Sequence, residues 1–77
     1  MKDYRKTALY KKLTPYLATV YAEQVLEGEN ATDEERLTAF QYLIDEDMIR
    51  KLQGWYGRTA DALFNKGLLL PPKQKKK

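Results

Sequence analysis

The stretch Gln53-Gly54-Trp55-Tyr56-Gly57-Arg58-Thr59-Ala60 decides how this chain folds, because it sets two large aromatic residues between two glycines. Glycine adopts backbone conformations that other residues avoid, and it lets neighbouring chain approach closely. Trp and Tyr each bring a large apolar ring with one polar tip, which suits them to anchor a turn. The stretch therefore predicts a sharp corner between two helices, with Arg58 at the start of the second helix.

Two amphipathic helices are expected before this corner. Thr14-Pro15 is a favourable helix start, and apolar residues recur at three- and four-residue spacing up to Gly28, which predicts a helix over residues 15–27. A capping box, formed by Thr32 and Glu35, precedes a second apolar stripe and predicts a helix over residues 33–45.

Two shorter helices are expected around the corner itself. Met48, Ile49 and Leu52 indicate a third helix that ends at Gly54. A fourth helix is predicted over residues 58–66 and is closed by a glycine. The apolar run that follows, residues 68–70, is expected to fold back over the core as a strap.

The predicted fold class is all-α, a compact bundle of four to five short helices with a partial helix-turn-helix-like corner. Residues 1–13 form a basic N-terminal segment that can be helical, residues 14–72 a single helical domain, and residues 73–77 a disordered lysine tail. The residues expected to fill the core are Leu17, Tyr21, Val25, Leu37, Phe40, Ile44, Ile49, Leu52, Leu63 and Phe64, together with Trp55 or Tyr56.

Composition excludes several kinds of chemistry. The 77 residues contain no Cys and no His, so disulfides and thiol nucleophiles are ruled out and a zinc site is not expected. The side chain that most often transfers protons near neutral pH is missing as well. No apolar run approaches the roughly 20 residues that a membrane span needs. We therefore expect a cytoplasmic protein without enzymatic activity, cofactor, metal or membrane contact.

Charge is distributed unevenly along the chain. Residues 1–12 carry a net charge of +4, residues 13–47 a net charge of −8 and residues 48–77 a net charge of +7. Such a partition creates local fields that the overall charge of +3 does not report. The acidic cluster Asp45-Glu46-Asp47 is interpreted as capping and solvated charge, although carboxylate pairs can also act as general acid and base or hold magnesium.

A recognisable pattern runs through the second half of the chain: Phe40-Gln41-Tyr42-Leu43-Ile44-Asp45, Leu52-Gln53-Gly54, Tyr56-Gly57-Arg58-Thr59-Ala60, Leu63 and Gly67. Residues 32–72 thereby resemble a set of small tailed-phage proteins that share the signature FQxLIDxG…LQGxYGRTAxxL and have no established activity. In those proteins the position of Trp55 varies and Tyr56 is kept, which implies that Tyr56 is buried and Trp55 exposed. They tend to have glycine where this chain has Asp47.

Small phage proteins of this kind often bind and redirect host machinery, so the resemblance implies work in the cytoplasm of an infected bacterial host. The preferred hypothesis is docking onto a host protein complex, with transcription machinery such as RNA polymerase as the first candidate. Trp, Tyr and Arg dominate the hot spots of protein interfaces. The expected docking residues are Trp55, Arg58, Arg50, Lys51 and Lys66.

The alternative hypothesis is a regulator that binds double-stranded DNA through a helix-turn-helix. With Gly54 as the turn glycine, Ala60 fits its expected position, whereas Arg50 stands where a small residue is usual. Residues 58–66 then enter the major groove, where Arg58 reads guanine or phosphate and Asn65 reads adenine. The basic ends add phosphate contacts. The residues expected to contact nucleic acid are Arg58, Thr59, Asn65, Lys66, Lys73, Lys75, Lys76 and Lys77.

Overall fold

The computed structural model describes residues 3–71. Within this range the chain forms four α-helices, α1 (Ala8–Lys12), α2 (Pro15–Glu23), α3 (Asp33–Asp45) and α4 (Gly54–Asn65), and three single turns of 3₁₀-helix, η1 (Tyr4–Lys6), η2 (Leu26–Gly28) and η3 (Ile49–Lys51). This architecture confirms the all-α fold class.

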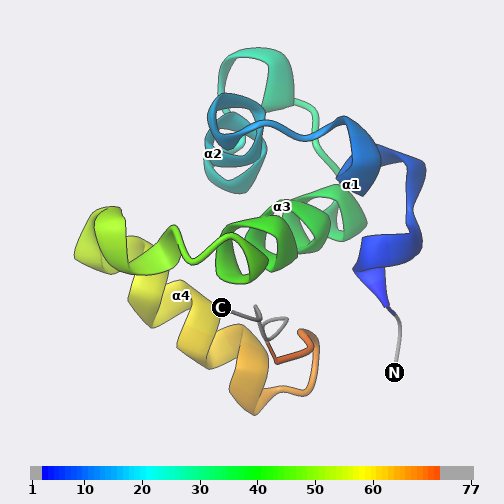
Figure 1. The fold of residues 1–77 in the computed structure, drawn as a ribbon. Coiled ribbons are helices and arrows are strands. Elements are labelled where there is room, and N and C mark those ends of the chain that lie inside the picture. Colours follow the sequence, from blue (N-terminus) through cyan, green and yellow to red (C-terminus); the bar gives the residue numbers. More distant parts are fainter. Residues whose placement is uncertain (1–2, 72–77) are drawn as a thin grey trace.

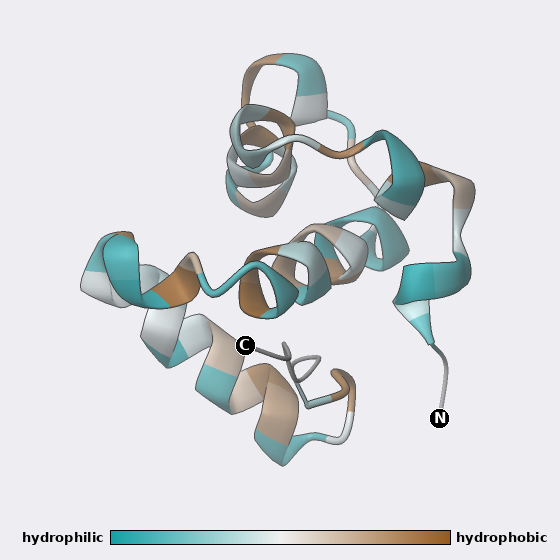
Figure 2. Ribbon diagram, viewed as in Figure 1, coloured by the Kyte–Doolittle hydropathy of each residue, from teal (hydrophilic) through white to brown (hydrophobic). Residues whose placement is uncertain are grey.

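Helix α3 runs through the middle of the molecule, with α2 on one side and α4 crossing on the other (Figure 1). It was predicted with the correct bounds, and the capping box between Thr32 and Glu35 forms as expected. The helices alternate hydrophobic and polar stretches (Figure 2), because each exposes one face while the other packs inward.

The core lies on both sides of α3. Phe40 and Leu43 are completely buried, and Tyr56 of α4 is 4% exposed. On the α2 side, Ala18 and Ala22 are completely buried, and small residues at such a contact let two helix backbones approach closely. Most of the other predicted core residues pack partly buried around this centre: Leu17, Tyr21, Leu37, Ile49, Leu52, Leu63 and Phe64.

Helix α2 ends four residues earlier than the sequence predicted. Gln24 turns the chain at a φ of 57°, and Leu26 follows at a φ of 51°. Gly28 is therefore not the helix cap; a Cβ at this position would lie 2.4 Å from the Val20 carbonyl oxygen. The placement of Val25 in the core was wrong, since the early turn leaves this residue 42% exposed.

The predicted corner at residues 53–57 is helical. Helix α4 already begins at Gly54, so Trp55 and Tyr56 belong to its first turn. The chain turns earlier, at Asp47 and through η3, which is one 3₁₀ turn in place of the predicted third helix. Asp47 has a φ of 57°, a left-handed conformation that glycine adopts without steric cost.

Residues 3–13 are part of the same fold. The segment is helical in η1 and α1, as the sequence allowed, and it lies against one edge of α3 (Figure 1). Tyr4 and Leu13 are buried, so the described part of this segment packs against the helical domain predicted over residues 14–72.

The apolar strap folds back as predicted. Leu69 is 2% exposed, and the backbone of Leu70 pairs with the side chain of Gln41. The Leu70 N–H donates to Oε1 of Gln41 at 2.8 Å, and Nε2 of Gln41 donates to the Leu70 carbonyl at 3.0 Å. The predicted lysine tail, residues 73–77, lies outside the described residues.

Two glycine substitutions should have opposite effects. Gly28→Ala should lower the free energy of unfolding by about 1–3 kcal/mol, because its methyl group meets the α2 backbone. Gly57→Ala should raise it by about 0.5–1 kcal/mol, because Gly57 lies inside α4 with open space beside it. Urea unfolding followed by circular dichroism measures both changes in the free energy of unfolding. If the two substitutions change it equally, Gly28 does not pack against the α2 backbone as described.

A third substitution tests the left-handed turn after α3. Asp47→Gly should raise the free energy of unfolding by about 0.5–1 kcal/mol, because glycine removes the strain of a positive φ. The matched control is Glu46→Gly at a φ of −87°, which should be neutral or destabilising. If both variants lose stability, Asp47 is not left-handed in solution.

Candidate functional site

Trp55 projects from the first turn of α4 and is held by three neighbours. Its ring centroid lies 6.0 Å from that of Phe40, and the two rings are tilted. It lies 4.8 Å from the centroid of Tyr56, and these two rings meet edge to face. The guanidinium carbon of Arg36 lies 5.9 Å from the Trp55 centroid, within the range of cation–π attraction. Trp55 nevertheless stays 38% exposed. The pattern of buried Tyr56 and exposed Trp55 agrees with what the resemblance implied.

Two charged residues of other helices frame the indole. Nε of Arg36 donates to the Ala22 carbonyl at 2.9 Å, which fixes the guanidinium beside the ring. Glu23, at the end of α2, accepts a hydrogen bond from the Tyr56 hydroxyl and lines a crevice with Trp55. Neither charged residue was expected. The one available signal was the i, i+4 spacing of Arg36 and Phe40, which puts both on one helix face.

Arg36 also lines an apolar groove between α3 and the end of α4. Leu37, Leu63, Leu68 and the acidic Asp33 line it as well, and Leu68 is 37% exposed. Arg36 therefore links the indole to the groove. We call the set of Trp55, Arg36, Leu37, Leu63 and Leu68 the seam surface.

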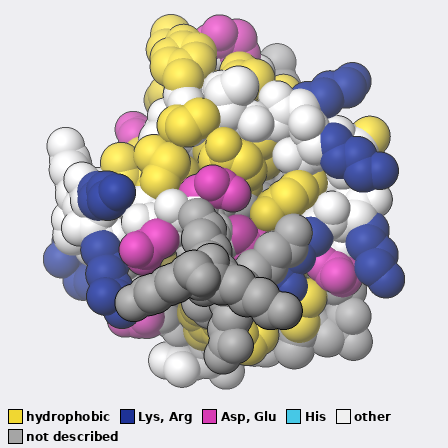
Figure 3. Space-filling model, in the orientation of Figure 1, with side chains coloured by type: hydrophobic (Ala, Val, Ile, Leu, Met, Phe, Trp, Pro, Cys, Tyr) yellow, Lys and Arg dark blue, Asp and Glu magenta, His cyan; other side chains and the backbone are white. Residues whose placement is uncertain are grey.

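The predicted docking cations do not form one continuous face with Trp55. Arg50 lines a separate crevice together with Asp61. Lys51 is exposed in η3, and Lys66 follows the far end of α4, about 16 Å along the helix axis from Trp55. On the face shown in Figure 3, Lys and Arg side chains gather at two opposite edges, over α1 and η1 and over η3.

Arg58 is the exception among these cations. It is exposed on the turn that follows Trp55, and its guanidinium folds back over Gly54, where a Cβ would lie 3.1 Å from Nη1. Arg58 is thus the predicted cation placed nearest to the seam surface along α4.

Helix α4 departs from a recognition helix in several respects. It begins four residues before the predicted start and follows a single 3₁₀ turn where a helix-turn-helix needs a full helix. Thr59 is half-buried, whereas Asn65 is exposed at the helix end. The exposed carboxylate of Asp61 on the same helix repels phosphate. Lys73, Lys75, Lys76 and Lys77 lie outside the described residues.

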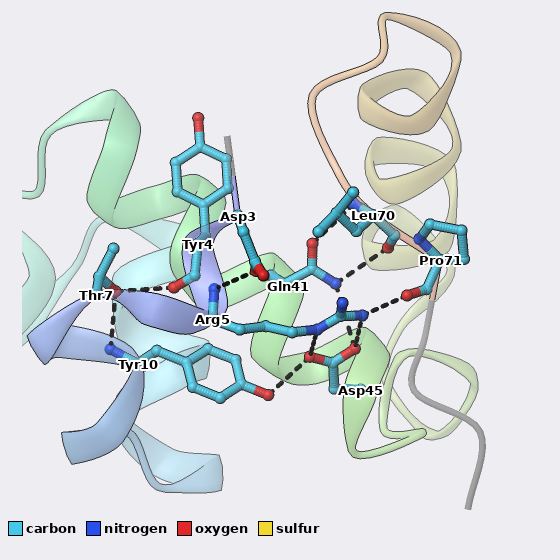
Figure 4. Close-up of polar contacts among 9 residues, drawn as sticks. All are labelled: Asp3, Tyr4, Arg5, Thr7, Tyr10, Gln41, Asp45, Leu70 and Pro71. Atoms are coloured by element: carbon cyan, nitrogen blue, oxygen red, sulfur yellow. Dashed lines mark hydrogen bonds and ion pairs between the residues drawn. The ribbon is translucent and has the colours of Figure 1, made fainter. Parts of the chain in front are cut away.

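A second cluster of polar side chains is buried between α3 and the two ends of the described chain (Figure 4). Nε and Nη2 of Arg5 donate to the two carboxylate oxygens of Asp45, at 2.6 and 2.7 Å. The Tyr10 hydroxyl donates to the Asp45 carboxylate at 2.7 Å. Nε2 of Gln41 donates to the same carboxylate at 3.2 Å. Arg5 also donates to the Pro71 carbonyl. We call these residues the Asp45 cluster.

The Asp45 cluster corrects the interpretation of Asp45, the first of three consecutive acidic residues, whereas Glu46 and Asp47 are exposed as expected. The Asp45 side chain is 1% exposed, so it is not solvated charge. Its carboxylate is occupied by Arg5, Tyr10 and Gln41 and serves to hold the N-terminal segment on α3. Across residues 3–71, no three potential metal ligands of the Asp, Glu, His and Cys types lie together. The same residues contain no helix long and apolar enough to cross a bilayer.

Two tyrosines bordering these sites have altered acidities. Burial and the hydrogen bond to Asp45 raise the pKa of Tyr10 well above its usual value. Burial and the hydrogen bond to Glu23 raise the pKa of Tyr56 in the same way. Both phenols therefore stay protonated in the folded protein at a pH where the unfolded chain loses these protons.

This difference predicts a loss of stability at alkaline pH. Each tyrosine contributes fully below about pH 10, the usual phenol pKa, and its contribution falls as the pH rises towards the higher folded-state value. At pH 7, Tyr10→Phe and Tyr56→Phe should each lower the free energy of unfolding by about 1 kcal/mol, because one hydrogen bond is lost. Urea unfolding should show that each variant is less stable than the unsubstituted protein at pH 7 and that this difference has disappeared at pH 11. A deficit that stays constant would contradict the assignment.

Comparison with known proteins adds one finding. No curated protein and no solved structure matches the chain. One family model matches residues 21–74, a segment that contains α3, α4, the strap and the whole seam surface. Arg5 and Tyr10 of the Asp45 cluster precede this segment. Because the match covers more than half of the 77 residues, the chain belongs to the family described as Domain of unknown function (DUF7417).

Proposed function

We propose that this protein is a non-enzymatic accessory protein that docks onto a larger protein complex through the seam surface. The observation that carries this proposal is the way in which Trp55 is packed. The indole is exposed to solvent, yet it is held by Phe40, Tyr56 and the guanidinium of Arg36. An aromatic anchor that is already ordered loses little conformational entropy when a partner covers it.

The composition of the surface supports the same role. Trp, Tyr and Arg are the residues enriched in binding hot spots, and here Trp55 and Arg36 border an apolar groove. Arg58 lies one turn away on α4 and offers a cation at the rim. Arg50, Lys51 and Lys66 lie further out, so we assign them at most to the periphery of the contact.

The kind of partner is suggested by the resemblance to small tailed-phage proteins. In that setting the protein acts in the cytoplasm of an infected bacterium, and the complex is a host machine, with RNA polymerase as the first candidate. DNA binding is the alternative outcome. Arg58 and Asn65 of α4 are exposed, but Asp61 on the same helix and the short η3 turn before it oppose a recognition role.

The test is retention of purified bacterial RNA polymerase on the tagged full-length protein. We expect retention that nuclease does not abolish. Trp55→Ala should weaken binding about 30-fold, the effect of a hot spot worth about 2 kcal/mol. Arg36→Ala should weaken it similarly, because Arg36 both contacts the partner and seats the indole.

Arg50→Ala is the matched control, because it removes a cation from the separate crevice and should leave retention unchanged. Circular dichroism must show that the Trp55→Ala variant is folded at the assay temperature. Binding that requires duplex DNA, falls steeply with salt and is lost in Arg58→Ala would instead support the DNA-binding alternative. Retention unaffected by Trp55→Ala would refute the seam surface as the docking site.

A further inference from the structure

Three large apolar side chains are exposed apart from the residues of the seam surface. One lies on the first turn of α2, and the other two lie on the hairpin that joins α2 to α3. Tyr16 is 54% exposed, Val25 42% and Leu26 69%. The Tyr16 hydroxyl donates to Glu27 at 3.0 Å, which places its ring beside η2. Hydrophobic side chains are visible at the upper edge of the molecule in Figure 3, where Figure 1 places η2. We call Tyr16, Val25 and Leu26 the hairpin patch.

The backbone holds this patch in an unfavourable conformation. Leu26 has a φ of 51°, in the left-handed region that a leucine rarely adopts. Several contacts keep the hairpin there: Gly28 packs against the α2 backbone, and Nε2 of Gln24 donates to the Ala31 carbonyl at 3.1 Å. A glycine would fit the turn with less strain and would expose no apolar surface. Leu26 therefore does not stabilise the fold, and a glycine at this position would be more favourable for stability.

The charged residues nearest in the chain to Val25 and Leu26 are acidic. No lysine or arginine occurs between Lys12 and Arg36 in the sequence. Glu27, which accepts the hydrogen bond from Tyr16, and Glu29 are exposed and follow Leu26 closely in the chain. Nucleic acid and anionic membranes are repelled by such a rim. A second copy of the chain that offered the same patch would bring its glutamates against these ones. Charge complementarity calls for a partner that carries cations beside an apolar surface.

We infer that the hairpin patch is a second docking site, which binds a basic amphipathic helix of a partner protein through Leu26, Val25 and Tyr16. The apolar row of such a helix covers the three side chains, and its flanking lysines or arginines meet the glutamate rim. The inference does not depend on the seam surface. A protein with both sites joins two partners, and Trp55 is not needed for the second.

The test uses two synthetic helical peptides of identical pattern, one of leucine and lysine and one of leucine and glutamate, with the full-length protein. We expect the lysine peptide to bind and the glutamate peptide not to bind. The amide resonances that shift on titration should be those of residues 16 and 25–27. Resonances that shift only around Trp55, or no binding of the lysine peptide, would overturn the inference.

One pair of variants and one further variant separate apolar recognition from plain charge attraction. Leu26→Asp and its matched control Leu68→Asp each exchange an exposed leucine for an acid. We expect Leu26→Asp to weaken binding about tenfold or more, whereas charge attraction alone strengthens binding in both variants. Leu26→Gly should bind about tenfold more weakly while its midpoint of thermal unfolding rises. Unchanged binding by Leu26→Gly would contradict the inference even if the variant is more stable.

Discussion

The fold depends on the neutralisation of one buried carboxylate. Asp45 ends α3 inside the protein, and its charge is balanced by Arg5 from the N-terminal end of the described chain. A buried carboxylate without a partner is strongly unfavourable, so Arg5 has to reach it and brings η1 and α1 with it. Gln41, one turn earlier on α3, pairs with the strap backbone and with Asp45. The two ends of the described chain are therefore held on α3 by one connected set of polar contacts.

The candidate interaction surfaces are built on this support in different ways. At the seam surface, the exposed residues are held in place by the core. Trp55 packs against Phe40. The strap buries Leu69 and thereby places the neighbouring Leu68 at the groove. At the hairpin patch, the exposure of Val25 and Leu26 is imposed by the backbone, since Gln24 and Leu26 are left-handed and turn the chain between the end of α2 and the start of η2. Order at the first site comes from packing, whereas order at the second comes from a tight loop that is anchored by Gly28.

Local signals predicted the elements that depend on local interactions. The bounds of α3 followed from the capping box and the apolar stripe, and the strap followed from three consecutive leucines after a glycine. Prediction failed where a glycine was taken as a stop signal without knowledge of its surroundings. Gly28 is needed for its lack of a side chain against Val20 and does not cap α2, whereas Gly54 and Gly57 lie inside α4. The left-handed residues Gln24 and Leu26 carry no sequence signal of that conformation.

The different exposure of Trp55 and Tyr56 was implied by the resemblance to small tailed-phage proteins. By itself, the amino-acid sequence determined that the protein is all-α and that it contains neither Cys nor His. These properties follow from composition and from spacing within one or two helical turns. Only the tertiary structure decided that Asp45 is buried, that Arg36 seats the indole, and that Arg50 and Trp55 line different crevices. Each of these depends on contacts between residues far apart in the chain. The energy of a charge or a ring is set by what surrounds it, and those surroundings exist only once the helices have packed.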